Sequence, residues 1–150
     1  RPAHADLQLV LVGALGWKTH GSLDAIARSG VADRIRLTGY VPDEDLAAVY
    51  AGADVFAYPS LYEGFGLPVL EAMQCGVPVV TTTGGSLPEV AGDAGLLVGP
   101  TDRDALVEAL ASARGNPRLM ASGLARSATF TWARSLDLTV AAYRAMLSSS

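Results

Sequence analysis

Residues 54–73 read DVFAYPSLYEGFGLPVLEAM, and this stretch indicates the fold. It opens with a short apolar run that stops at Pro59, as a buried strand of a parallel sheet does. Pro68 suits the first turn of a helix, where its missing N–H is no loss, so a helix is predicted over residues 67–75. A strand, a glycine-rich loop and a helix therefore follow one another directly.

Strand and helix patterns alternate on both sides of this stretch as well. Alternation of this kind predicts a Rossmann-like α/β fold, a three-layer parallel sheet with helices on both faces. Three residues are the expected N-caps: Asp43, Thr101, and Ser86 in a capping box with Glu89. The predicted strands are residues 7–12, 35–37, 54–58, 78–81 and 95–98, and the predicted helices are residues 18–29, 67–75 and 131–147 with others beginning at Asp43, Ser86, Thr101 and Asn116.

Composition and charge exclude several function classes. The chain has 150 residues, 50% of them hydrophobic and 17% charged, which is typical of one globular domain with a core. A net charge of −4 argues against nucleic acid as a partner, and the apolar runs are far shorter than the ~20 residues of a membrane span. Cys75 is the single cysteine, so a reducing, cytoplasmic compartment is expected. His4 and His20 have no metal-ligand partners at suitable spacing, so no metal site is predicted.

The glycine-rich loop is the expected functional site, because ligands of such folds bind where the strands end. Gly64 and Gly66 remove side chains just before a helix, so N–H groups at Gly66 and Leu67 can face an anion such as a phosphate. Glu63 and Glu71 flank this point, and a carboxylate suits the two hydroxyls of a ribose. In the alternative interpretation, Glu71 is only a favourable first-turn charge and Glu63 a solvated loop residue.

The same residues resemble glycosyltransferase family 4. Residues 63–73 contain that family's motif of a glutamate, seven residues and a second glutamate. The resemblance spans residues 7–147 and implies a retaining enzyme of GT-B architecture, of which this chain is the carboxy-terminal, nucleotide-sugar-binding half. Further blocks in the family's order are GYVP at 39–42, ADVF at 53–56, GVPVV at 76–80, GGSLPEV at 84–90, GLLV at 95–98 followed by Asp102, and FTW at 130–132.

The resemblance implies a role for each motif residue. Glu63, the candidate catalytic residue, would contact hydroxyls of the transferred sugar, and Glu71 would bind the ribose. The loop backbone between them would hold the sugar or the diphosphate. Tyr40 and Val41 would border the base, and Gly13 would let the chain approach the donor closely. The residues expected to bind the donor are Gly13, Tyr40, Val41, Gly64, Phe65, Gly66, Leu67 and Glu71.

The implied reaction is transfer of a hexose from a nucleotide sugar to a glycan or lipid-linked acceptor, with retention of anomeric configuration. GDP-mannose is the favoured donor on resemblance alone, which points to a mannosyltransferase of polysaccharide biosynthesis. Neither a metal ion nor another cofactor is implied, since fixed dipoles and positioning stabilise the developing charges. The full enzyme is expected in the cytoplasm, with peripheral association at the inner face of the membrane through its other half.

The start of the chain departs from the family pattern. The family's carboxy-terminal domain opens with a strand and a loop whose Arg and Lys clamp the diphosphate, and neither precedes Leu7. Lys18 follows a later strand and is not assigned that role. The start at Arg1 instead of Met indicates a fragment or a processed product. The acceptor-binding domain that the resemblance implies is absent, so we expect the chain to be inactive by itself. Its exposed sheet edge is expected to favour dimerisation or strand exchange.

Three other functions compete with this interpretation. A nicotinamide dehydrogenase needs a G-x-G-x-x-G loop, but residues 13–16 read GALG and Asp33 precedes a strand instead of ending it. A nucleotide-sugar 2-epimerase has a related two-domain architecture, and the block from Glu63 to Glu71 argues against it. A non-catalytic module that binds nucleotide sugars stays open, and the sequence upstream would decide it.

Overall fold

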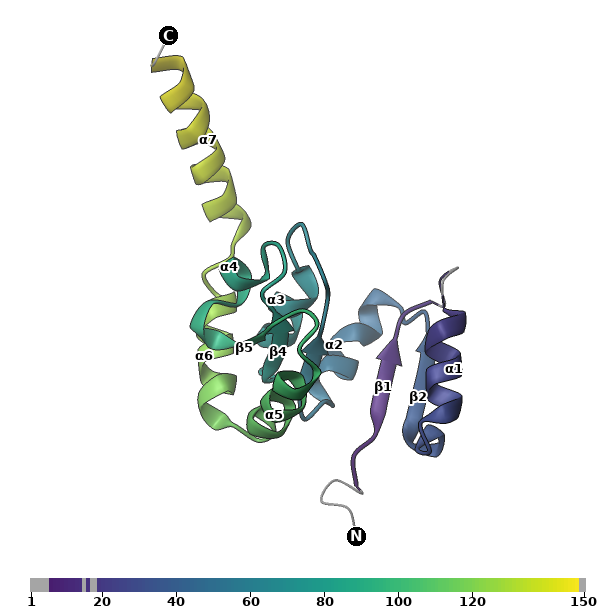
Figure 1. Cartoon of the computed structure of the whole chain (residues 1–150). Coiled ribbons are helices and arrows are strands. Elements are labelled where there is room, and N and C mark those ends of the chain that lie inside the picture. The colour runs from purple at the N-terminus through teal and green to yellow at the C-terminus, as the bar shows by residue number, and fades with distance from the viewer. Residues whose placement is uncertain (1–5, 15, 17–18, 149–150) are drawn as a thin grey trace. The chain divides into compact units, whose positions relative to one another are not determined.

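A computed structural model describes residues 6–14, 16 and 19–148. His4 and Lys18 therefore lie outside the described residues. The chain divides into two compact units, residues 1–46 (unit 1) and residues 47–150 (unit 2), and the boundary lies within helix α2 (Asp43–Ala51). The strands form a parallel two-stranded sheet in unit 1 and a parallel three-stranded sheet in unit 2 (Figure 1). Along the chain, helices connect the successive strands. The predicted α/β class with parallel strands is confirmed.

Unit 1 contains the first two predicted strands. The apolar run LVLV becomes β1 (Leu9–Val12), which pairs in parallel with β2 (Ile35–Gly39). Helix α1 (His20–Arg28) and a short 3₁₀ turn (Ala32–Arg34) connect them. A crossover helix is what a parallel pair requires, because its strands must start from the same end.

Unit 2 is built on three strands in the order β3 (Phe56–Tyr58), β4 (Val79–Thr82), β5 (Leu96–Val98). Helix α3 (Leu67–Gln74) links the first pair, and α4 (Leu87–Ala91) with a 3₁₀ turn (Gly92–Ala94) links the second. Every residue of β4 is buried, as expected for the central strand of a sheet covered on both faces.

The core of unit 2 lies on both faces of this sheet. Side chains alternate along a strand, so Val79 joins a cluster formed with α3 and α4, whereas Val80 joins a cluster on the other face. Helix α5 (Arg103–Ala113) supplies Ala109 and Ala113 to the second cluster, as its spacing predicts. Helix α6 (Pro117–Ser127) follows Asn116, and none of the residues of α7 (Trp132–Ser148) is buried.

Of the three predicted N-caps, Ser86 is confirmed without its capping box, whereas Asp43 and Thr101 are wrong. Asp43 is the first residue of α2 itself. Helix α5 is capped by Asp102 instead of Thr101: the Asp102 side chain accepts a hydrogen bond from the Ala105 N–H at 3.0 Å. Ser86 does occupy the N-cap of α4, but its side chain makes no cap hydrogen bond, so the capping box does not form. Its hydroxyl instead donates to main-chain carbonyl oxygens of the loop between β3 and α3.

Candidate functional site

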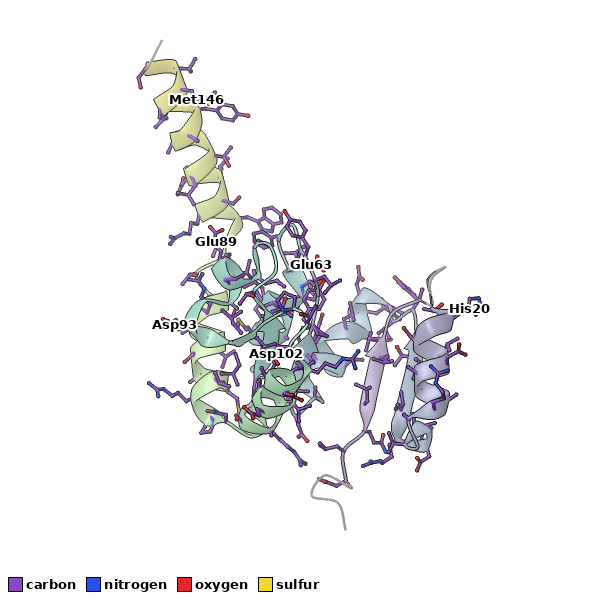
Figure 2. The ribbon with its side chains drawn as sticks, viewed as in Figure 1. His20, Glu63, Glu89, Asp93, Asp102 and Met146 are labelled. Atoms are coloured by element: carbon purple, nitrogen blue, oxygen red, sulfur yellow. The ribbon has the colours of Figure 1, made fainter. Side chains whose placement is uncertain are left out.

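Glu63 lies in the loop from β3 to α3 (Figure 2). Two hydroxyl groups at the start of this loop fix its carboxylate. Tyr58 ends β3, and its hydroxyl donates to Glu63 Oε1 at 2.9 Å. The Ser60 hydroxyl donates to the same oxygen at 2.7 Å. One carboxylate oxygen thus accepts two hydrogen bonds, and Oε2 accepts none from the described residues.

These contacts keep Glu63 ionised and Tyr58 neutral. The hydrogen bonds from Ser60 and Tyr58 hold the pKa of Glu63 below its ordinary value, because they stabilise the charged form. Burial, together with the hydrogen bond to Glu63 and its charge, raises the pKa of Tyr58 to about 12. At neutral pH the loop therefore presents a fixed negative charge with one oxygen open to a ligand.

Glycines shape the end of this loop. Gly66 caps α3 with φ 99°, in the left-handed region that favours glycine, and a Cβ there would lie 2.7 Å from Leu87 Cδ2. Because Gly66 has no side chain to cap the helix, the N-terminal end of α3 is open to an anion. A Cβ at Gly64 would meet nothing within 4 Å, so packing does not require that glycine. Leu67 and Phe65 are exposed.

Glu71 is held by a second tyrosine. The Tyr50 hydroxyl, on α2, donates to Glu71 Oε2 at 2.9 Å, and burial with this hydrogen bond raises the pKa of Tyr50. The Tyr50 ring meets Phe56 edge-on at 5.2 Å between centroids, and Phe56 stacks on Tyr58 at 6.0 Å. A continuous row of three aromatic rings therefore joins the tyrosines that hold the two glutamates.

A loop that follows β4 supports the main chain of the Glu63 loop. The single proton of the Ser86 hydroxyl is shared between Phe65 O at 2.8 Å and Glu63 O at 3.1 Å. The Ser86 N–H also donates to Glu63 O. A Cβ on Gly84 would lie 2.3 Å from Leu61 O, and one on Gly85 2.2 Å from Glu63 O. Only glycines allow the two loops to approach this closely.

This support was missed in the sequence, although a signal for it exists. Thr82 ends the central strand β4, and Gly84 and Gly85 follow it closely. Parallel strands bring the loops at their carboxyl ends to one edge of the sheet. The Thr82 hydroxyl donates to Ser60 O, which ties the start of the Glu63 loop to that edge. Tyr50 and Tyr58 were also not predicted as site residues.

The remaining predicted residues lie in unit 1. Gly13, with φ 129°, donates its N–H to Gly39 O at 3.0 Å where β1 and β2 end, and Tyr40 and Val41 follow directly. A hollow of about 190 Å³ adjoins Gly13, lined by residues of β1, β2 and α1. The structure thus gathers Gly13, Tyr40 and Val41 at one edge of unit 1, and Glu63–Leu67 with Glu71 in unit 2.

Two further properties concern metal ions and membranes. In the described part of the chain, no three His, Cys, Asp or Glu side chains cluster closely enough to hold a metal ion. Among the described helices, none combines the length and the apolar character needed to cross a bilayer.

Comparison with known proteins matches the chain to one family. The model of the family Glycosyl transferases group 1 matches residues 1–116. The O-antigen chain mannosyltransferase B of Escherichia coli is 46% identical over 140 residues, which are 91% of this chain and 37% of that protein. The MMP alpha-(1->4)-mannosyltransferase of Mycolicibacterium hassiacum is 40% identical over 147 residues, 92% of this chain and 35% of the relative.

Solved structures show the same fold. The sucrose-phosphate synthase of Thermosynechococcus elongatus superposes with a TM-score of 0.80 at 31% identity, over 95% of this chain and 39% of that one. The Anabaena protein Alr3699/HepE, solved with UDP-glucose, gives a TM-score of 0.77 at 23% identity, over 95% of this chain and 41% of the other. The latter likeness shows the fold alone. The chain spans between a third and two fifths of the length of these relatives.

Proposed function

The chain belongs to the family Glycosyl transferases group 1, and on that premise we propose that it supplies the donor-binding half of a retaining hexosyltransferase. The proposed donor is a nucleotide sugar, with GDP-mannose favoured, and the acceptor a glycan or a lipid-linked glycan. Relatives named as mannosyltransferases at 40–46% identity support the choice of sugar. The observation that carries the proposal is the pair of separately fixed carboxylates, Glu63 and Glu71, on either side of the open start of α3.

Each part of the loop has a proposed task. The ionised Glu63 accepts hydrogen bonds from hydroxyls of the transferred sugar and lies near the positive charge that develops as the bond to the diphosphate breaks. The N-terminal end of α3, at Gly66 and Leu67, faces the diphosphate with its positive dipole. Glu71 accepts from the ribose hydroxyls. Gly13, Tyr40 and Val41 remain candidates for contact with the rest of the donor.

Charge stabilisation by helix α3 also favours a reaction without a metal ion. The dipole of a helix N-terminus stabilises an anion within its first turn, and here it would act on the departing diphosphate. We expect unchanged transfer by the whole protein after dialysis against EDTA. Loss of activity on EDTA treatment, with recovery on adding a divalent cation, would contradict this part of the proposal.

Calorimetric titration of the 150-residue chain tests donor binding. GDP-mannose, UDP-glucose, UDP-GlcNAc and ADP-glucose are compared for the wild type and for Glu71→Ala. Glu108→Ala, which removes an exposed glutamate of α5, is the matched control. We expect one nucleotide to bind, Glu71→Ala to abolish that binding, and Glu108→Ala to retain it. A folded Glu71→Ala chain that binds as tightly as the wild type would refute the role of Glu71.

Location and assembly are also part of the proposal. We place the protein in the cytoplasm, in line with a single free cysteine, and propose peripheral association of the whole enzyme with the inner face of the membrane. The two-stranded sheet of unit 1 leaves one edge of each strand without a paired strand among the described residues, and such edges favour pairing between chains. Sedimentation velocity over a range of concentrations tests dimerisation of the chain.

A further inference from the structure

The two glutamates of the proposed site are each bonded by a tyrosine from outside the motif. Tyr58 donates to Glu63 Oε1 and Tyr50 donates to Glu71 Oε2, both at 2.9 Å. Neither tyrosine lies within residues 63–71, and Tyr50 is 21 positions from its partner. In each case one carboxylate oxygen is occupied, which fixes the rotation of the carboxylate about its last torsion.

The tyrosine rings are themselves held in place. Phe56 lies between them, edge-on to Tyr50 at an interplanar angle of 77° and stacked on Tyr58 at 18°. All three rings are half-buried and pack against the buried cluster that includes Met73. A hydroxyl on a packed ring is a rigid donor, since the ring cannot swing away without disturbing its neighbours. The orientation of both carboxylates is therefore set by this aromatic row.

We propose that Tyr58 and Tyr50 are positioning residues of the donor site, Tyr58 acting through Glu63 on the sugar and Tyr50 acting through Glu71 on the nucleoside. This inference rests on the function proposed above. Tyr58 and Ser60 together occupy Glu63 Oε1, so Oε2 is the oxygen left for a sugar hydroxyl. Likewise Tyr50 occupies Glu71 Oε2 and leaves Oε1 for the ribose.

The geometry makes the two tyrosines separable by experiment. Tyr58→Phe and Tyr50→Phe each remove one hydroxyl and keep the ring, so the packing of the row is retained. Tyr58→Phe should weaken the binding of a nucleotide sugar more than the binding of the free nucleotide, because only the sugar contacts Glu63. Tyr50→Phe should weaken both alike, because both carry the ribose.

The first measurement does not depend on a ligand. The titration of the Glu63 side-chain carboxyl is followed by carbon-13 NMR in the 150-residue chain. In the wild type its pKa should lie below the ordinary ~4.3, and in Tyr58→Phe it should rise towards that value. Ser60→Ala, which removes the other donor to Oε1, should shift the pKa in the same direction. Tyr143→Phe, on a tyrosine of α7 that is 65% exposed, is the matched control and should leave it unchanged.

The second measurement uses GDP and GDP-mannose as probes. Loss of one orienting hydrogen bond to a charged group should weaken binding by about tenfold. We expect Tyr58→Phe to weaken the binding of GDP-mannose by about that factor and to leave the binding of GDP nearly unchanged. Tyr50→Phe should weaken the binding of both probes by a similar factor. Tyr143→Phe again serves as the control.

The outcomes separate the inference from the function on which it rests. An unchanged Glu63 pKa in a folded Tyr58→Phe chain would overturn the positioning role, whatever the binding data. Equal weakening of the binding of both probes by Tyr58→Phe would also overturn the role of Tyr58, because only the sugar meets Glu63. If the wild type binds neither probe while Tyr58→Phe raises the pKa of Glu63, the proposed donor is wrong. The hydrogen bond by which Tyr58 orients Glu63 is then still supported.

Discussion

Replacing Gly85 by alanine should disturb the proposed site through the main chain alone. Gly85 has φ 61°, and a Cβ there would lie 2.2 Å from Glu63 O and 2.9 Å from Glu63 N, where ordinary contact begins at 3.4 Å. Gly115, between α5 and α6, provides a matched comparison, because its φ is 65° and a Cβ there would meet nothing within 4 Å. The two substitutions therefore share the left-handed strain and differ in the collision with Glu63.

The expected magnitudes follow from this comparison. A left-handed alanine costs about 1–2 kcal/mol at either position. At Gly85 the collision with backbone atoms adds about 1–3 kcal/mol, as overpacking does in other cores. Movement of Glu63 O also weakens its bonds from Ser86, each contributing about 0.5–1.5 kcal/mol. Gly85→Ala should thus be less stable than Gly115→Ala by about 2–4 kcal/mol.

Urea unfolding followed by circular dichroism measures this difference, and thermal unfolding provides a second estimate. For a chain of this size, each kcal/mol corresponds to roughly 2–4 °C in Tm. Backbone NMR shifts should change at Glu63 and Phe65 in Gly85→Ala and remain unchanged there in Gly115→Ala. Equal losses of stability in the two variants, or unchanged shifts at Glu63 in Gly85→Ala, would refute the close approach of the two loops.

Three further substitutions test other parts of the structure. In a spectrophotometric titration at 295 nm, the signal that Tyr58→Phe removes should titrate near pH 12 instead of the ordinary ~10. Because the pKa of Tyr58 is raised in the folded state, the stability that Tyr58 contributes should be present below pH ~10 and lost as the pH rises through 12. The difference in unfolding free energy between the wild type and Tyr58→Phe should therefore disappear over that pH range. Asp102→Ala removes the cap bond of α5 and should lower the unfolding free energy by about 1 kcal/mol, whereas no loss would favour Thr101 as the cap. Met73→Ala, at a fully buried position, should lower the unfolding free energy measured in urea by about 2–5 kcal/mol. Met120→Ala, at a position 41% exposed, should lower it much less. Similar losses in the two variants would contradict the assigned core.

The strands and helices were predictable because their signals are local. The apolar run LVLV of β1 and the proline in the first turn of α3 each specify their element without reference to distant residues. The motif residues Glu63 to Glu71 were identified for the same reason, since one loop and the helix that follows contain them all. Local pattern also sufficed for the parallel arrangement, which the alternation of elements requires.

The partners of these residues were not predictable, because they come from distant parts of the chain. Ser86 has the right spacing for a capping box, yet its hydroxyl reaches carbonyl oxygens of the Glu63 loop, 21 and 23 positions away. The sequence around a serine shows only whether its spacing suits a cap of its own helix. It does not show that an acceptor in another loop competes for the hydroxyl. The same limit applies to Tyr50, which has the spacing of a core-facing helix residue and also donates to Glu71.

Two separate sets of contacts converge on Glu63, and together they explain how a loop with exposed residues can hold a carboxylate in a fixed position. Its main chain is fixed by Ser86 and by the absence of a side chain at Gly85, both from the loop after β4. Its carboxylate is fixed by Tyr58 and Ser60, from the end of β3. Because β3 and β4 are paired in one sheet, both sets of contacts anchor Glu63 to the same rigid sheet. A loop anchored in this way remains open to a ligand without being free to move relative to the strands beneath it.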